Sequence, residues 1–362
     1  MIMSELQEAV GCDNESYSSA QSSYFSAQAR SSSPACIVSP TTGAEVALIL
    51  KVLVERKVKF ALRGGGHTLN PGAANIEGGV TISLRGLKGV KLKEDEALVS
   101  IGGGAKWSEV YPVLNGLGIA TSDGRVADVG VGGSTTGGGL SFFSSREGLV
   151  CDNVENYEVV LADGSVLNAN KSNNQDLWQA LKGGSNNFAI VTPFDIRTFP
   201  QENFYGGRII YDISTLDEQL NGFAKLLENF DMYAAIMMSI SWDQKRNLYS
   251  IFNNLEFTKN DNALVSLKPF LDAKPQYMNP MRISNLTDFA AETGRFAPSG
   301  LSWQSVEDDD KVTAAAKKLI ADIDEAGKEK GVGSNFRYPK YAAGWQNPIK
   351  GYGGKAGNFE RG

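Results

Sequence analysis

Histidine is almost absent from this chain: 362 residues contain a single one, His67. Catalysis by Ser-His-Asp or Cys-His groups could therefore use only His67, and no metal site rich in histidine can form. Acid–base chemistry elsewhere must use Tyr, Glu, Asp or Lys. Cysteine is scarce as well, and the wide spacing of the three residues offers neither a zinc site nor a dense disulfide scaffold. A bridge between Cys12 and Cys36 is left open, but free buried thiols are expected if the protein is intracellular.

A surplus of positive charge and a long apolar run are also missing. The net charge of −6 argues against nucleic acid or an anionic membrane as partner. The most apolar run, residues 46–54, is interrupted by Lys51, and no segment is long enough to span a bilayer. Residues 1–11 are too acidic and too weakly apolar for a secretory signal. An intracellular protein is expected, or a secreted one if the N-terminus has been trimmed.

Glycine, by contrast, is abundant, with 40 residues, many of them before residue 190. The chain is long enough for one large core or two ordinary ones. Up to about residue 200 strands and helices mix without strict βαβ alternation, which predicts an α+β fold. From Pro200 on, amphipathic helices at 216–230 and 311–326 and strand-like runs between them predict a second domain, an antiparallel sheet with helices on one side. Residues 12–33, rich in Ser, Tyr and Gln, are expected to form an irregular arm.

The most informative stretch is Leu62-Arg63-Gly64-Gly65-Gly66-His67-Thr68. In residues 58–62, which lead into this stretch, apolar residues alternate with polar or small ones, which predicts a strand with one buried face. Three glycines can take positive φ and bring backbone N–H groups against a ligand. A strand that delivers this loop, a cation and an imidazole to one point suits an anionic ligand. The alternative is a plain turn followed by a structural histidine.

Two other nucleotide-binding motifs are weaker. The segment Gly130-Val131-Gly132-Gly133-Ser134-Thr135 lacks the last glycine of the dinucleotide fingerprint, and residues 124–128 before it make a poor core strand. Asp152 lies roughly where a ribose-binding acid would, but one acidic residue is little support. No P-loop sequence occurs.

Several motifs occur in a characteristic order and spacing: residues 63–68, 129–139, 152–154, 159–164 and 183–192. Together they resemble the FAD-linked oxidases of the berberine-bridge-enzyme-like group, within the vanillyl-alcohol oxidase and p-cresol methylhydroxylase (PCMH) superfamily, and most of all its fungal members. The resemblance implies a two-part PCMH-type FAD-binding domain over residues 1–200 and a substrate domain over 201–334. Residues 335–362 would return to the FAD domain but resemble an incomplete version of the family's final segment.

The resemblance also implies FAD as cofactor and assigns roles. His67 matches the histidine that bonds to the flavin 8α-methyl carbon. Val126 stands where members with a second covalent link have cysteine, so a single link through His67 is expected. The pyrophosphate loop would be Arg63, Gly64, Gly65, Gly66, His67 and Thr68. The second loop would be Gly130, Gly132, Gly133, Ser134, Gly137, Gly138 and Gly139, and Asp152, Asn153 and Val191 would line the adenosine side or the ring.

Tyr338 and Tyr341 resemble tyrosines of a late family segment that closes over the flavin, which makes them candidate catalytic bases. Lys340 and Ala343 replace the Asn and Asp of that segment, and ordinary aromatic packing is the alternative for both tyrosines.

The function implied is that of an FAD-dependent oxidase. Hydride would pass from a small alcohol or a secondary metabolite to flavin N5 and then to O₂, giving hydrogen peroxide. Sugars are less favoured, because members that act on them often carry the cysteine that is missing here. The alternative is a degenerate member that acts as a non-redox cyclase or isomerase, or as a scaffold in a biosynthetic pathway.

Overall fold

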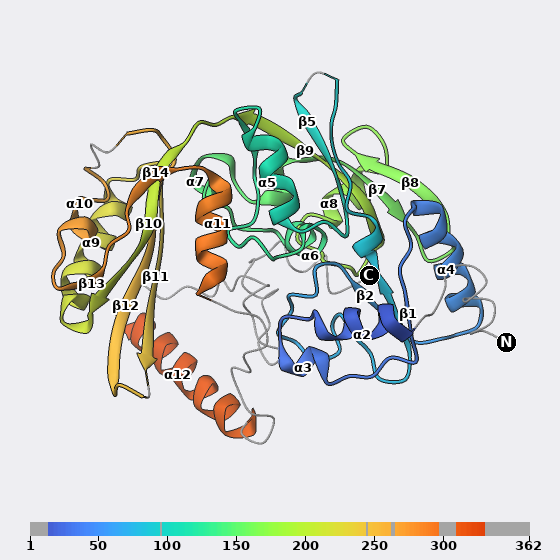
Figure 1. Ribbon diagram of the computed structural model, residues 1–362, viewed down its shortest axis with the longest axis horizontal. Coiled ribbons are helices and arrows are strands. Elements are labelled where there is room, and N and C mark those ends of the chain that lie inside the picture. The colour runs from blue at the N-terminus through green and yellow to red at the C-terminus, as the bar shows by residue number, and fades with distance from the viewer. Residues whose placement is uncertain (1–13, 95, 244, 262–264, 297–308, 330–362) are drawn as a thin grey trace.

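The computed structural model describes residues 14–94, 96–243, 245–261, 265–296 and 309–329. Within these residues the chain forms a small parallel sheet and two larger antiparallel sheets, with helices around them (Figure 1). Apart from one βαβ crossover, β1-α4-β2, strands and helices mix without strict βαβ alternation, which confirms the expected α+β class.

The parallel sheet carries the central stretch of the sequence. Its strand order is β1-β3-β2, with β1 at Cys36–Val38, β3 at Val80–Ser83 and β2 at Phe60–Arg63. Helix α4 (Gly43–Glu55) begins where the Thr42 hydroxyl accepts a hydrogen bond from the Glu45 N–H, at 3.2 Å. Its buried face packs with β1 and β3 into one apolar cluster, as the 3.6-residue period predicts.

The first antiparallel sheet has the order β4-β5-β9-β7-β8, with β6 paired to β9 outside this path. Strands β7 and β8 form a hairpin that turns at Asp163-Gly164 and pair in antiparallel register. Its strands are β4 (Val90–Leu92), β5 (Leu98–Gly102), β6 (Ile119–Thr121), β7 (Val154–Val160), β8 (Val166–Asn170) and β9 (Ile190–Pro200). The helical segments among them are η1 (Leu84–Gly86), α5 (Trp107–Asn115), α6 (Val131–Thr136), α7 (Ser144–Glu147), η2 (Val150–Asn153) and α8 (Gln175–Ala180).

The second antiparallel sheet follows Pro200 and has the order β11-β12-β10-β13, with β14 also paired to β10. Its strands are β10 (Phe204–Asp212), β11 (Ala234–Asp243), β12 (Leu248–Phe257), β13 (Gln276–Met278) and β14 (Arg282–Ser284). The helical segments of this part are η3 (Ile213–Thr215), α9 (Leu216–Glu228), α10 (Lys268–Asp272), α11 (Leu286–Arg295) and α12 (Asp309–Glu329).

The placement of helices on this second sheet differs from the expectation in one respect. Helices α9 and α10 pack on the face that carries Ile209 and Leu255. Helix α11 lies on the opposite face, where Phe289 approaches Gly206, and it also packs against α5 of the first part. The helices are therefore not confined to one side, because one of them fills the boundary between the two sheets.

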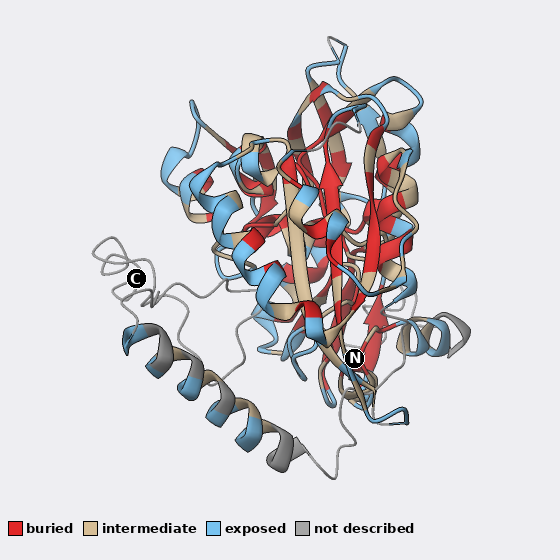
Figure 2. Ribbon diagram, turned by 90° about the vertical axis from the view of Figure 1, so that its left-hand side faces the viewer, coloured by how far each residue is buried: buried red, intermediate tan, exposed pale blue. Residues whose placement is uncertain are grey.

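One of the apolar clusters runs across that boundary. Figure 2 shows buried residues concentrated on the strands and exposed ones on the outer helices and loops. The rings of Phe143 and Phe199 lie 5.2 Å apart, edge to face, and those of Phe204 and Phe289 lie 4.9 Å apart. The first pair belongs to the N-terminal part and the second to the C-terminal part, and all four are members of one buried cluster. Only three residues separate β9 from β10, so the chain passes directly from one sheet to the next.

Two expectations about the N-terminal region are wrong. Residues 14–30 are largely helical, with α2 at Asn14–Ser22 and α3 at Ala27–Arg30, rather than irregular. Cys36 is disulfide-bonded rather than a free thiol, whereas Cys151 is free and buried as expected.

Candidate functional site

The two glycine-rich loops predicted from the sequence touch each other through their backbones. A Cβ atom added to Gly65 would lie 2.5 Å from the Gly130 nitrogen and 2.6 Å from its Cα. The reverse also holds, because a Cβ on Gly130 would overlap the Gly65 nitrogen. Any side chain at either position would force the loops apart, so glycine at both is required by this close approach.

A third glycine segment, at the end of β5, completes the contact. The Gly103 N–H donates to the Thr192 carbonyl, at 2.5 Å, and a Cβ on Gly103 would overlap the Val191 carbonyl. A Cβ on Gly132 would in turn overlap the Gly103 carbonyl. Backbone from four distant parts of the sequence therefore meets at one point, and Val191, a predicted site residue, is buried there on β9.

Gly133 differs from its neighbours, because a Cβ added to it would meet no protein atom within 4 Å. Gly64 is also relatively open, with the Gly103 carbonyl at 3.5 Å and the Gly133 nitrogen at 3.8 Å as the nearest atoms. Gly64 and Gly133 thus lie against each other through their backbones, and beside them the Cα of Gly133 faces space that no side chain of the described residues fills. An open, side-chain-free surface of this kind suits a ligand that needs close approach to peptide N–H groups.

His67 follows directly on the first loop and is held by an aromatic partner. Its imidazole stacks on Phe25, with ring centroids 4.0 Å apart and an interplanar angle of 17°. The Phe25 N–H donates to the Gly66 carbonyl, at 3.0 Å, which fixes the partner to the same loop. The loop and the stacked ring together set the position of the imidazole.

The charge state of His67 follows from its surroundings. Burial lowers its pKa below the ordinary value of 6.5, and Lys106 acts in the same direction, whereas Asp128 raises it by a smaller amount than burial lowers it. The ring is therefore neutral at pH 7 and has an unprotonated nitrogen. A neutral imidazole can act as a nucleophile or as a ligand, which a protonated one cannot.

Arg63 is the last residue of β2, next to the loop, but its side chain binds to the N-terminal helical segment. Its guanidinium donates to the Ala20 carbonyl at 2.8 Å and to the Ser23 hydroxyl at 2.5 Å, and it lies 4.1 Å from the Tyr24 ring centroid. Arg63 is only 3% exposed, and its Nε atom is buried without a hydrogen-bond partner. The structure therefore directs this cation to α2, where it anchors the arm to the loop.

The remaining residues of the second loop have structural partners within the described residues. The Ser134 hydroxyl accepts from the Trp107 indole N–H and donates to the Gly130 carbonyl, both at 2.9 Å. Gly137 ends α6, and Gly138 and Gly139 have φ of +102° and +77°, which favour glycine. Their carbonyls accept from the N–H groups of residues 150 and 151 and so place η2 beside the loop.

Thr68, Asp152 and Asn153 are similarly occupied. Thr68 accepts from the Asn70 N–H through its hydroxyl. The exposed Asp152 carboxylate accepts from the Leu149 N–H at 2.9 Å. The buried Asn153 amide donates to the carbonyls of residues 147 and 149 and accepts from Arg197 at 2.6 Å. The side chains of Asp152 and Asn153 shape the turn before β7, whereas Thr68 bonds within the first loop, and the assignment of all three to the cofactor stays a prediction.

Two features of this site, Phe25 and Gly103, have little signal in the sequence. Phe25 lies in a segment without apolar periodicity, so nothing marked it as a partner of His67. Gly103 belongs to a run of three glycines, Gly102 to Gly104, which was the only available signal for the third contact. Tyr338 and Tyr341 lie outside the described residues. Among the described residues no cluster of His, Cys, Asp and Glu could hold a metal ion, and no helix has the length and apolar character needed to cross a membrane.

Comparison with known proteins agrees with this geometry. Residues 34–170 match the model of a family described as FAD binding domain. An FAD-dependent monooxygenase of Cercospora beticola is 35% identical over 305 residues, which are 80% of this chain and 58% of that protein. An FAD-dependent monooxygenase of Aspergillus calidoustus is 29% identical over 421 residues, covering 93% of this chain and 80% of that protein. The chain thus spans little more than half the length of the Cercospora relative.

Solved structures share the fold. The 6-hydroxy-D-nicotine oxidase of Arthrobacter nicotinovorans superposes with a TM-score of 0.72 at 20% identity, over 80% of this chain and 64% of that one. The xylooligosaccharide oxidase of Myceliophthora thermophila superposes with a TM-score of 0.69 at 25% identity, over 83% of this chain and 64% of that one. These neighbours confirm the two-domain, PCMH-type architecture and the resemblance to the berberine-bridge-enzyme-like group. The chain thus shares its fold with these FAD-linked oxidases and is similar in sequence to the fungal FAD-dependent monooxygenases, and both glycine loops lie within the residues matched to the FAD binding domain.

Proposed function

We propose that this chain binds FAD across the contacting glycine loops, with His67 as its single covalent attachment, and oxidises a small alcohol or a secondary metabolite. The observation that carries the proposal is the contact between the two glycine loops, with the open side of Gly133 next to it and a neutral imidazole at the end of the first loop. A pyrophosphate is dianionic and is best met by peptide N–H groups without side chains in the way. The residues present therefore fit the cofactor.

Each residue of the site has a defined task in this proposal. The chemistry that bound FAD would supply is a hydride acceptor at N5, with O₂ as the final electron acceptor and H₂O₂ as the product. His67 offers an unprotonated nitrogen for attachment at the 8α carbon, and Phe25 restrains the plane of its ring. Arg63 holds α2 against the loop, which keeps Tyr24 and Phe25 in place. Tyr338 and Tyr341 remain the proposed bases.

The names of the relatives bear on whether O₂ is reduced to H₂O₂ or gives one of its atoms to the product. The curated fungal relatives are FAD-dependent monooxygenases, in which one oxygen atom of O₂ enters the product. The glucooligosaccharide oxidase of Acremonium strictum, at 22% identity, carries a 6-S-cysteinyl, 8α-N1-histidyl FAD. Monooxygenation is therefore a second candidate for this chain, and the yield of peroxide per substrate distinguishes the two. No contact among the described residues favours the non-redox alternative.

The disulfide at Cys36 bears on the compartment. Disulfides persist in oxidising compartments and are rare in the cytosol. This bond weighs for the secreted alternative against the intracellular one.

The test is a visible spectrum of protein expressed with ample riboflavin, recorded before and after precipitation with acid. The wild-type pellet should stay yellow, because the flavin is attached, whereas His67→Ala and His67→Gln should release flavin into the supernatant. Substrate added without oxygen should bleach the bound flavin. A colourless wild-type protein would contradict FAD binding, and a yellow pellet in both variants would contradict attachment through His67.

A further inference from the structure

The glycine loops are left without the cation that the sequence predicts for them. Arg63 is only 3% exposed, and its guanidinium donates to Ala20 and Ser23 of the N-terminal helical segment. Peptide N–H groups carry only partial positive charge, whereas a pyrophosphate is dianionic. Hydrogen bonds from a charged donor to phosphate are stronger than those from a neutral one. If the loops bind a pyrophosphate, another positive side chain is therefore expected beside them.

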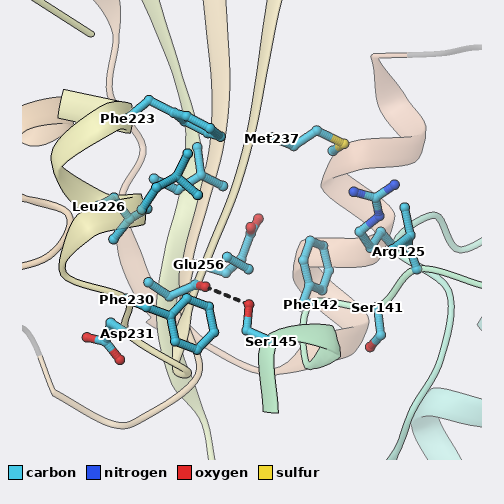
Figure 3. A pocket seen from close by; sticks show the side chains of 15 residues that line it. Arg125, Ser141, Phe142, Ser145, Phe223, Leu226, Phe230, Asp231, Met237 and Glu256 are labelled. Atoms are coloured by element: carbon cyan, nitrogen blue, oxygen red, sulfur yellow. Dashed lines mark hydrogen bonds between the residues drawn. The ribbon is translucent and has the colours of Figure 1, made fainter. Parts of the chain in front are cut away.

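A cavity of about 290 Å³ between residues 140–145 and strand β11 is unsuited to phosphate groups (Figure 3). Most of the side chains labelled around it are apolar: Phe142, Phe223, Leu226, Phe230 and Met237. Arg125 also lines it, but that side chain already has another interaction within the protein. The carboxylate of Asp231, in the same lining, would repel an anion. A phosphate would lose its hydration there without regaining hydrogen bonds, so the glycine loops are the better place for it.

Lys106 is a positively charged residue that lies directly against the second loop. It forms an isolated antiparallel bridge with Gly130. Backbone hydrogen bonds on either side of this bridge, at 2.8 and 3.1 Å, join residues 105–107 to residues 129–131. Gly130 is also the residue whose backbone contacts Gly65 of the first loop. The backbone of Lys106 is therefore fixed beside the point where the two loops meet.

The charge of Lys106 also acts at the end of the first loop. Burial has the largest effect on the pKa of His67 and lowers it; among the charged side chains of the described residues, Asp128 raises this pKa and Lys106 lowers it. The Nζ atom of Lys106 lies 3.3 Å from Oδ1 of Asp128. Since His67 follows directly on the first loop and Asp128 comes just before the second, the ammonium group lies close to both loops.

The ion pair with Asp128 leaves Lys106 able to bind a ligand. An ammonium group has three N–H donors, and one of them bonds Asp128. The side chain of Lys106 keeps 27% of its exposure and that of Asp128 keeps 69%, so a ligand can reach the ammonium. An ion pair as exposed as this one is weak, because water screens it. A phosphate oxygen shielded by the loops is a stronger partner for the same ammonium.

We propose that Lys106 is the cation of the cofactor site, and that its ammonium group donates a hydrogen bond to the pyrophosphate of the dinucleotide on the two glycine loops. Lys106 thus takes the role that the sequence assigns to Arg63. The proposal rests on the proposed function, because it adds a binding residue to the same FAD site. It explains how the loops can hold two negative charges although Arg63 is directed to the N-terminal helical segment.

The test measures the dissociation constant of FAD by fluorescence in the His67→Ala chain, in which binding is reversible. Lys106→Met in this background keeps an unbranched side chain without the charge, so the constant should rise about tenfold, as expected for one charge-assisted hydrogen bond. The difference should shrink as NaCl rises from about 0.02 to about 0.5 M, because salt screens the interaction. Lys106→Arg keeps a positive charge and should restore most of the affinity. Asp128→Asn is the matched control: it breaks the same ion pair but keeps the ammonium, so the constant should stay unchanged or fall.

An unchanged dissociation constant in Lys106→Met would overturn the proposal. Equal weakening by Lys106→Met and Asp128→Asn would do the same, because it would show that the ion pair only shapes the loop. Urea unfolding of the flavin-free variants checks the fold, and a loss of stability in Lys106→Met alone, without rescue by Lys106→Arg, would also count against it. FAD binding by His67→Ala with no effect of Lys106→Met refutes the role of Lys106 alone. Colourless wild-type protein together with no FAD binding by His67→Ala refutes the proposed function and this proposal with it.

Discussion

Replacing Gly65 by alanine tests the contact on which the cofactor site depends. The added methyl group would lie 2.5 Å from the Gly130 nitrogen, whereas ordinary Cβ contacts begin at 3.4 Å. The two loops would have to separate by about 0.9 Å, and neither can yield through a side chain, because both partners are backbone. Overpacking of this kind costs about 1–3 kcal/mol.

The expected result of Gly65→Ala is a loss of both stability and flavin. The free energy of unfolding in urea should fall by about 1–3 kcal/mol, and the flavin-to-protein absorbance ratio should fall with it, since the loops proposed to hold the cofactor would have moved. Two other alanine variants serve as controls, because a Cβ at Gly89 or at Gly133 meets no protein atom within 4 Å.

The controls separate packing from ligand contact. Gly89 lies beside the third glycine segment, because its carbonyl accepts a hydrogen bond from the Gly102 N–H, but a methyl group on it would meet no protein atom, so Gly89→Ala should change neither quantity. Gly133→Ala should leave stability unchanged or raise it by up to about 1 kcal/mol, as alanine in a helix does, while lowering flavin content if the cofactor approaches that Cα. Wild-type stability together with full flavin content in Gly65→Ala would refute the described contact between the loops.

Two further predictions concern single interactions. Phe25→Ala should leave FAD bound but lower the fraction that survives acid precipitation, because His67 loses the ring that orients it; a fully attached flavin in this variant would show that the stacking has no such role. The Glu109 carboxylate accepts a hydrogen bond from the Arg85 guanidinium at 2.9 Å. Burial raises the pKa of Glu109, but the hydrogen bonds from Arg85 and from the Lys106 backbone lower it by more, so that its pKa lies below the ordinary 4.5. A carboxyl group whose pKa is lower in the folded than in the unfolded protein stabilises the fold at pH values above its unfolded pKa. This stabilisation is lost as the pH falls through the folded pKa. Glu109→Gln should therefore cost about 1 kcal/mol in urea unfolding at pH 7 and little at pH 3, and an equal cost at both would argue against the ion pair.

Local signals in the sequence predicted much of the cofactor region. The alternation of apolar residues just before the first glycine loop is a local signal, and the structure has the predicted strand there, β2. The glycine loops were recognised because their composition and order are typical of one family. The contact between Gly65 and Gly130 was not predictable in the same way, because it joins residues far apart in the sequence.

The N-terminal arm shows why the remaining features were missed. Residues 14–22 have low hydrophobicity and no strong helical pattern, so local preference predicts irregular structure there. The helix is supported instead by tertiary contacts, above all those of Arg63 with Ala20 and Ser23. Because of these contacts, the Arg63 side chain binds residues 20 and 23 and not the expected ligand. No local sequence pattern predicts this, since the contacts join residues about 40 positions apart.

The aromatic core that joins the two sheets limits how the chain can be divided. Leu286, Phe289 and Ala290 of α11 are nearly completely buried in a cluster made mainly by the N-terminal part. A fragment cut after β9 would present that apolar surface to water, and a chimera with a foreign second half would need to reproduce its shape. Exchange of the substrate domain to obtain a new specificity therefore has to carry α11 and the surface of α5 together, as one transplanted unit.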